Sequence, residues 1–581
     1  MIKAIKALAP VLAKAIFSGR LFTGKAELLE PLEDILAEWD VEVTVSDGST
    51  ILMNIFKSRK ALADKRALPV IMCAHPYDNH LVPALGKTPL KGVPQQYRLI
   101  DQVGKPRFSA LTSWESPDPN FWVANDYIVV NMNLPGYGGS TGEASVFNRN
   151  QSRAYYEVIE WVAEQDWCNG NVGLNGVSFL AISQYHVAAC RDYGNKAPKA
   201  LKCISPWEGI TDMYRDLVNW GGVPQDGFPA FWWETEVKPS MTGDPKLFIK
   251  NQGSTPPDFI QNHPFFDEFW EEKRAPVEHI EIPILTCVSF SDVGLHTNGG
   301  YRSFMDVKSK EKWMYTHRGG KWDVYYNPEV QELTLKFMDY YLKGRTDNGW
   351  DKVAPVRVEV RSDRDTIHEV RAEHEWPIAR TQYNRFYLSD DHELALSHET
   401  EESEISYHGK KGKQSFRLRF TEGAEVSGHA KLKIWMELRD PHGKQDDFHL
   451  HTVLNKYDKH GQRVPFYGTV GNKNDVLTRG HMRASLRELD KEKSTDIIPY
   501  HSFQRYQKLT HGEIVCMEVP FPPTSVFFHE GESLELTVAS YEIFQNAPMM
   551  KDNSLNQRGK HIIHMGGKYD TFLQLPMIPR S

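Results

Sequence analysis

The chain has 581 residues, of which 40% are hydrophobic and 25% charged, and its net charge at pH 7 is −8. This length predicts two or three domains, because a single hydrophobic core rarely grows so large. The acidic balance disfavours a nucleic-acid partner, whose phosphates attract basic surfaces. No apolar stretch approaches the roughly 20 residues that a membrane-spanning helix needs.

The N-terminus and the cysteines bear on the cellular compartment. The first 20 residues begin like a signal peptide, but Lys14 and Arg20 interrupt the apolar stretch and no small-residue cleavage site stands out. We therefore expect a short amphipathic helix packed on the body of the protein. The six cysteines are dispersed and form no C-x-x-C pair, which indicates reduced, buried thiols. These features predict a cytoplasmic protein.

Short apolar runs alternate with helical patterns over the first 345 residues, as is typical of a mostly parallel sheet covered by helices. Alternating hydrophobic residues flank Asp47-Gly48 and predict an opening hairpin. Residues 154–165 carry apolar side chains at helical spacing and predict a helix. Buried strands are predicted at 69–74, 127–132, 172–175, 200–204, 284–288 and 312–315.

Two further segments have a different texture. Residues 208–275 contain many aromatic side chains and no buried-strand pattern, which predicts a helical insertion with its own small core. We expect this insertion to cap an active site and to contribute aromatic side chains to a substrate pocket. After the turn-rich residues 347–349, short strands separated by Gly, Pro and Asn indicate a β-sandwich.

The segment Gly176-Val177-Ser178 follows an apolar strand and precedes a helical run, which is the context of a nucleophile elbow. So tight a turn needs a neighbour without a Cβ atom, and Gly176 meets that need. The following helix would direct backbone N–H groups at a developing oxyanion. Leu180 occupies the position of the second glycine of the usual motif, so the pattern alone also fits an ordinary turn with a capping serine.

The partners of such a serine follow it in the order acid, then histidine, each just beyond a later strand. Asp292 follows the predicted strand 284–288, and His317 follows the predicted strand 312–315. We therefore predict a triad in which His317 takes the proton of Ser178 and Asp292 orients the imidazole, giving an acyl-enzyme. His296 is the rival base, but its position four residues after Asp292 suggests that it lines the pocket.

An oxyanion hole needs two donors. The first would be the backbone N–H of Phe179, the residue after the nucleophile, and the second would come from the loop after an early strand, which contains His75 and Tyr77. The Gly-rich residues 133–142 follow another strand, but their spacing matches neither a Walker loop nor a dinucleotide fingerprint. We interpret them as a tight loop beside the elbow.

Taken together, these motifs resemble the cocaine-esterase-like CocE/NonD hydrolases, which are related to X-Pro dipeptidyl-peptidases and α-amino-acid ester hydrolases. The resemblance implies that Leu180 and Ala181 are normal in the elbow and that the Tyr77 hydroxyl is the second oxyanion donor. It implies an α/β-hydrolase fold with a helical cap and a C-terminal, galactose-binding-like jelly-roll. Phe290 departs from the pattern, since Trp is frequent there. The residues that carry the resemblance are 76–78, 136–142, 176–181, Asp292, 316–317, 480–487 and the β-rich run 512–538.

The predicted domains are an α/β-hydrolase domain in two parts, a helical cap and an all-β jelly-roll. Their expected bounds are 1–207 and 276–346 for the hydrolase domain, 208–275 for the cap and 347–581 for the jelly-roll. The candidate pocket residues are His75, His296, Trp207, Trp232 and Trp233.

We expect a serine hydrolase that cleaves an ester or amide bond of a small acyl substrate, without a cofactor. An X-Pro dipeptidyl-peptidase-like aminopeptidase or an α-amino-acid ester hydrolase is the alternative, although no carboxylate cluster that would hold a substrate ammonium is apparent. The expected partner is the small-molecule substrate, not nucleic acid or a membrane, and a homo-oligomer is left open.

A third interpretation makes the β domain a carbohydrate-binding module. His449 and His451 would place two imidazoles on one face of a strand, but no third ligand is apparent at coordination spacing. We therefore predict no metal site.

Overall fold

The computed structural model describes residues 26–85, 104–225, 227–440, 442–469, 472–543 and 555–579, together with Ala13, Ile16 and Phe17. The amphipathic helix expected within the first 20 residues falls, apart from those three residues, outside this part of the chain. No helix in the described ranges is long and apolar enough to cross a membrane.

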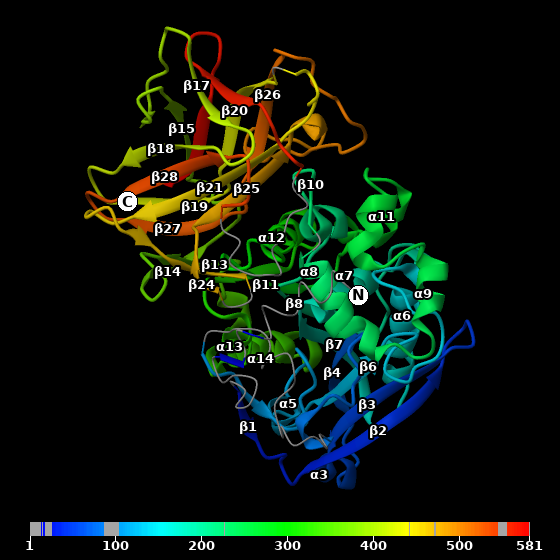
Figure 1. Cartoon of the computed structure of the whole chain (residues 1–581). Helices are drawn as coiled ribbons and strands as arrows, with labels where there is room; N and C mark the ends of the chain where they lie inside the picture. The colour runs from blue at the N-terminus through cyan, green and yellow to red at the C-terminus, as the bar shows by residue number, and fades with distance from the viewer. Residues whose placement is uncertain are drawn as a thin grey trace.

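A mixed sheet forms the centre of the α/β part (Figure 1). Each predicted strand is present, because strands buried on both faces form continuous apolar runs that are visible in the sequence. The strands are parallel from β6 onward, preceded by an antiparallel hairpin. Their spatial order is β2 (Ile35–Thr44), β3 (Thr50–Ser58), β6 (Ile128–Asn133), β4 (Leu68–His75), β7 (Cys168–Val177), β8 (Leu201–Trp207), β11 (Ile284–Ser289) and β12 (Lys312–His317).

Helices cover both faces of this sheet. On one face α6 (Arg149–Ala163) and α7 (Phe179–Ala188) pack against β7, while α14 (Pro328–Leu342) packs against β7 and β8 on the other. Successive residues of a strand point to opposite faces, so two separate apolar clusters form. This arrangement fixes the carboxyl ends of the parallel strands, where the predicted catalytic residues lie.

The segment 208–275 is largely helical. It contains a short hairpin, β9 (Asn219–Trp220) with β10 (Val223–Pro224), and several helices. Its buried aromatic side chains belong to the same apolar cluster as the hydrolase core instead of forming a separate one. The helices of six or more residues in this insertion are α8 (Gly227–Trp232), α9 (Pro245–Gln252) and α11 (Glu268–Lys273).

The C-terminal part is all-β and holds its own apolar core between two sheets (Figure 1). One sheet has the order β18 (Lys413–Arg419), β28 (Ser533–Ala539), β21 (His449–Tyr457) and β22 (Arg463–Val464), with β25 (Thr478–Arg483) also paired to β21. The first strand after the hydrolase part, β13 (Val356–Arg361), pairs in parallel with β12 through Met314 and Val356. That strand therefore extends the hydrolase sheet, although its sequence pattern places it with the β domain.

Candidate active site

Ser178 stands at a sharp turn between β7 and α7, with backbone angles φ +60° and ψ −117°. Gly176 has φ +151°, and a Cβ atom there would lie 2.6 Å from Leu180 Cβ. A Cβ atom on Gly209 would lie 3.1 Å from Ala181 Cβ. The elbow therefore tolerates Leu180 because Gly176 lacks a side chain, while the neighbouring loop at Gly209 approaches the small Ala181.

An imidazole and a carboxylate continue from the serine in one chain of contacts. Ser178 Oγ lies 3.1 Å from His296 Nε2, and His296 Nδ1 lies 2.5 Å from Asp292 Oδ2. The His296 N–H donates to the Asp292 carbonyl, so a single turn before α12 (Thr297–Asp306) brings both side chains together. Both side chains are buried. The structure thus brings together Ser178, His296 and Asp292.

His317 does not reach Ser178, contrary to the predicted triad. It is the last residue of β12, and its Nε2 lies 3.0 Å from Glu208 Oε1 at the end of β8. In the sheet β12 is three strands from β7, or roughly 14 Å at the usual strand spacing. Two strands, β8 and β11, lie between them, and Glu208, the residue that follows β8, contacts the His317 imidazole. His296 avoids this obstacle because it folds back from the loop after β11.

Lys321 joins the two histidine–acid pairs, and no sequence motif marks it or Glu208. Its Nζ lies 2.8 Å from Asp292 Oδ2, 2.9 Å from His296 Nδ1 and 3.6 Å from Glu208 Oε2. Burial and the Lys321 charge together lower the pKa of His296 despite the opposing charge of Asp292. Burial opposes ionisation of Asp292, but Lys321 and His296 outweigh it and lower the pKa of that carboxyl. The imidazole is therefore neutral and can accept a proton.

The carboxylates and imidazole here could also be considered as metal ligands. Ligand atoms of Glu208, Asp292 and His296 lie within 4.8 Å of one another. However, the Lys321 ammonium contacts Asp292 and lies close to Glu208, so it already neutralises the charge that a metal ion would neutralise.

A cavity opens beside Ser178, and its wall is mostly apolar and aromatic. Of the five predicted pocket residues, His296 and Trp232 line it. His75, Trp207 and Trp233 do not line it. The lining residues are Tyr77, Trp114, Glu115, Phe147, Ser178, Phe179, Ile182, Ile210, Leu217, Phe228, Trp232, Glu236, Leu295, His296, Lys321 and Trp322.

The three predicted residues that miss the cavity have structural contacts instead. The Tyr77 backbone N–H donates to His75 Nδ1 at 3.2 Å, which holds the loop after β4. The Trp207 ring stacks on His317, with centroids 6.1 Å apart, and Trp233 packs on Phe248 at 4.7 Å. These side chains support the walls without reaching the cavity.

The two predicted oxyanion donors both line the cavity. Phe179 is the first residue of α7, so its N–H has no intrahelical acceptor. The Tyr77 hydroxyl accepts a hydrogen bond from Trp232 Nε1 at 3.0 Å. Burial raises the pKa of Tyr77, so the phenol keeps its proton and can donate it.

The sequence did not predict two carboxyl groups that lie in the cavity wall. Glu115 follows β5 (Arg107–Ser109) and accepts a hydrogen bond from Trp322 Nε1 at 2.9 Å, while Glu236 comes from the cap. Burial raises the pKa of Glu115 to about 8. Burial and the neighbouring Glu115 raise the pKa of Glu236. Only folding brings the two residues to one cavity, so no sequence spacing could reveal them.

Two protein-family models match consecutive parts of the chain. Residues 47–322 match the model of the X-Pro dipeptidyl-peptidase (S15) family, and residues 348–574 match the C-terminal non-catalytic domain of X-Pro dipeptidyl-peptidases. A cocaine esterase from Rhodococcus is 25% identical over 329 residues, or 48% of this chain and 54% of that protein. An Xaa-Pro dipeptidyl-peptidase from Lactobacillus helveticus is 22% identical, over 48% of this chain and 38% of that protein. The matches therefore span about half or less of these curated relatives.

Solved structures extend the match to nearly the full length. A CocE/NonD family hydrolase from Staphylococcus aureus superposes with a TM-score of 0.83 at 34% identity, covering 94% of each chain. An α-amino acid ester hydrolase superposes with a TM-score of 0.65 at 13% identity, covering 94% of this chain and 97% of the other, and so shares the fold. With both domains matched and the resemblance confirmed, the chain belongs to the CocE/NonD family and is a serine hydrolase.

Proposed function

We propose that this protein hydrolyses an ester or amide bond of a small acyl substrate, with Ser178 as nucleophile, His296 as general base and Asp292 as the orienting acid. The observation that carries this proposal is the contact chain from Ser178 Oγ through both nitrogens of His296 to Asp292 Oδ2. Ser178 and His296, at one end of this series of contacts, line a cavity that can hold the acyl group. The assignment replaces His317 with His296.

The reaction follows from these contacts. Ser178 Oγ attacks the substrate carbonyl carbon while its proton moves to His296 Nε2. Asp292 stabilises the imidazolium that forms. When the tetrahedral intermediate collapses, His296 passes the proton to the leaving oxygen or nitrogen, and an acyl-enzyme remains. His296 then takes a proton from water, whose oxygen attacks the acyl carbon, and returns that proton to Ser178 Oγ.

The negative oxygen of each intermediate needs donors that are in place before the reaction. The Phe179 N–H and the Tyr77 hydroxyl are the proposed donors, because both groups line the cavity that contains Ser178. Trp232 donates to the Tyr77 oxygen, which leaves the hydroxyl proton for the substrate. Preorganised donors of this kind supply a large part of the rate of acyl transfer.

Active-site labelling tests the nucleophile, and hydrolysis of a substrate panel tests the bond type. A fluorophosphonate probe should label the wild type and fail to label Ser178→Ala. Nitrophenyl esters of increasing acyl length and the matching anilides would then establish the preference between ester and amide. Labelling that survives in Ser178→Ala would overturn the proposal.

A second candidate is an acyl substrate that carries a protonated amine, as in amino-acid esters or N-terminal dipeptides. The specific observation in its favour is the pair Glu115 and Glu236 in the wall of the cavity. A cation bound there would compensate for two buried carboxyl groups that burial otherwise keeps protonated. Faster hydrolysis of an alanyl ester than of the isosteric isobutyryl ester would support this function, and an X-Pro anilide would test the dipeptidyl form.

A further inference from the structure

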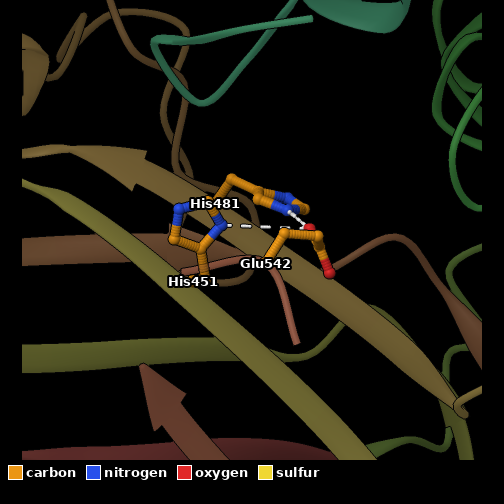
Figure 2. A group of neighbouring side chains, drawn as sticks. All are labelled: His451, His481 and Glu542. Carbon is orange, nitrogen blue, oxygen red and sulfur yellow. Dashed lines mark hydrogen bonds and ion pairs between the residues drawn. The ribbon is translucent and has the colours of Figure 1, made fainter. Parts of the chain in front are cut away.

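Two strands of the β domain and the loop after a third strand bring metal-ligating side chains to one place (Figure 2). His451 on β21 (His449–Tyr457) lies directly opposite His481 on β25 (Thr478–Arg483). On the other side of β21, His451 lies opposite Ala539, the last residue of β28 (Ser533–Ala539), and Glu542 follows shortly after. The register of the sheet therefore sets two imidazoles and one carboxylate side by side.

The geometry of this group is compact. Glu542 Oε2 lies 2.6 Å from His481 Nε2 and 3.9 Å from His451 Nδ1. Ligand atoms of all three residues lie within 4.8 Å of one another, and all three residues are buried. In a tetrahedral zinc site with bonds of about 2.1 Å, ligand atoms are roughly 3.4 Å apart. A shift of under ~1 Å along each side chain would therefore bring these atoms to coordination distance.

A third imidazole, that of His449, supplies an independent observation. His449 precedes His451 by two positions on β21, so both side chains lie on the same face of the strand. Its ring is 6.3 Å from that of His451, and it is buried. Within the part of the chain that the structure describes, neither ring nitrogen of His449 has a hydrogen-bond partner. A buried imidazole of this kind needs a partner, which the atoms of the described ranges do not supply.

The local charges also distinguish this group from two similar clusters. Lys321 stands within the active-site cluster, and Arg439 binds both Glu404 and Glu437 in the cluster around His564. Here Arg479 lies 3.8 Å from the other oxygen of Glu542, Oε1, and also pairs with Asp475. The oxygen Oε2 therefore faces the imidazoles, while Arg479 can orient the carboxylate as outer partners of metal ligands do.

We propose that His451, His481 and Glu542, with His449 as a fourth ligand, bind a zinc ion in the β domain. A set of imidazole nitrogens with one carboxylate oxygen suits Zn²⁺, whereas Ca²⁺ and Mg²⁺ prefer oxygen ligands. Sequence spacing could not show the site, since its ligands come from two strands and from a loop that lie far apart in the sequence.

The site lies beneath the contact between the cap and the β domain. The Trp220 ring of the cap hairpin is 5.4 Å from the His481 ring, and the Arg483 N–H donates to the Gly221 carbonyl at 2.8 Å. A Cβ atom on Gly221 would lie 1.8 Å from the His481 carbonyl oxygen, so the hairpin backbone sits directly on β25. Bound zinc would link β21, β25 and the loop after β28, and would so stabilise the part of the β domain that contacts the cap hairpin.

The test uses the full-length protein, stripped of metal with a chelator and then titrated with zinc chloride. Plasma mass spectrometry should find about one zinc per chain, and zinc should raise the temperature of thermal unfolding. His481→Ala and the nearly isosteric Glu542→Gln should each lose the bound zinc and the thermal shift. His564→Ala is the matched control, because it removes another buried imidazole that is bonded to a glutamate, Glu437, at 3.0 Å. This control should keep both.

Several results would overturn the proposal. The wild type could bind no zinc at micromolar free metal, or Glu542→Gln could bind zinc as well as the wild type does. Anomalous scattering at the zinc edge could instead locate the ion at the active-site cluster, where Asp292→Asn would remove it. If His481→Ala fails to fold, the wild-type titration and Glu542→Gln still decide, since neither needs that variant.

Discussion

Replacing His296 by alanine removes the one imidazole that contacts Ser178 Oγ in the described part of the chain. Without it, the serine proton has no acceptor at 3.1 Å and the leaving group has no acid. Removal of a triad histidine has cost about 10⁶-fold in a well-studied serine protease. We expect kcat/KM of His296→Ala to fall by at least ~10⁴-fold, or about 5.5 kcal/mol of transition-state stabilisation at 1.36 kcal/mol per tenfold.

The companion variant is His317→Gln, whose amide can still donate to Glu208. His317 contacts Glu208 and not the nucleophile, so the folded variant should keep most of its activity. His317→Ala instead leaves a buried carboxylate without its imidazole, which typically lowers the free energy of unfolding by about 3–5 kcal/mol. The predicted effect of His317 is thus on stability, and that of His296 is on turnover.

The assay is steady-state hydrolysis of a nitrophenyl ester, with active sites counted by fluorophosphonate labelling and folding checked by circular dichroism. A well-folded His317→Gln that is as inactive as Ser178→Ala, beside an active His296→Ala, would refute the assignment. It would mean that the contact between Ser178 and His296 is not the one used in catalysis.

Three further changes probe the surrounding groups. Lys321→Met removes a positive charge that lowers the pKa of His296, so the acid limb of the profile of kcat/KM against pH should move to higher pH. Tyr77→Phe should lower kcat roughly 10²-fold with little change in KM, as expected for a lost oxyanion donor. Glu115, with a pKa of about 8, is protonated at neutral pH. If the substrate is cationic, KM for an ester with a fixed quaternary ammonium should fall as pH rises through this value, and Glu115→Gln should abolish that dependence.

Much of the fold can be predicted from the sequence because its signals are local. Buried parallel strands appear as apolar runs, the elbow needs Gly176, and the β domain shows short strands between turn residues. The exception, β13, has the pattern of a sandwich strand yet pairs with β12 of the hydrolase sheet. An apolar pattern shows that a strand is buried but does not identify the strand with which it pairs.

The site is harder to predict because its function depends on where side chains point at strand ends. Glu115 and Glu236 come to line one cavity only when the chain has folded. Lys321 lies on a short helix that carries no catalytic motif. The residues of the elbow can be predicted from the sequence because a tight turn restricts the residue types at a few neighbouring positions. Residues that meet across the cavity are far apart in the sequence, so no pattern of neighbouring residue types reveals them.

The choice between the two histidines illustrates this limit. The rule that an acid precedes the histidine is satisfied by His296 and by His317, since both follow Asp292 in the chain. The difference is one of reach: His317 ends β12 within the plane of the sheet and meets Glu208, whereas His296 turns back over the carboxyl ends of the strands toward β7. Because Lys321 contacts the Asp292–His296 pair and lies near Glu208, it couples the charges of the two pairs. A change in the pair of His317 and Glu208 should therefore alter the pKa of His296, which the Glu208 charge raises. The pH profile of a His317 variant then reports on His296 even where its turnover does not.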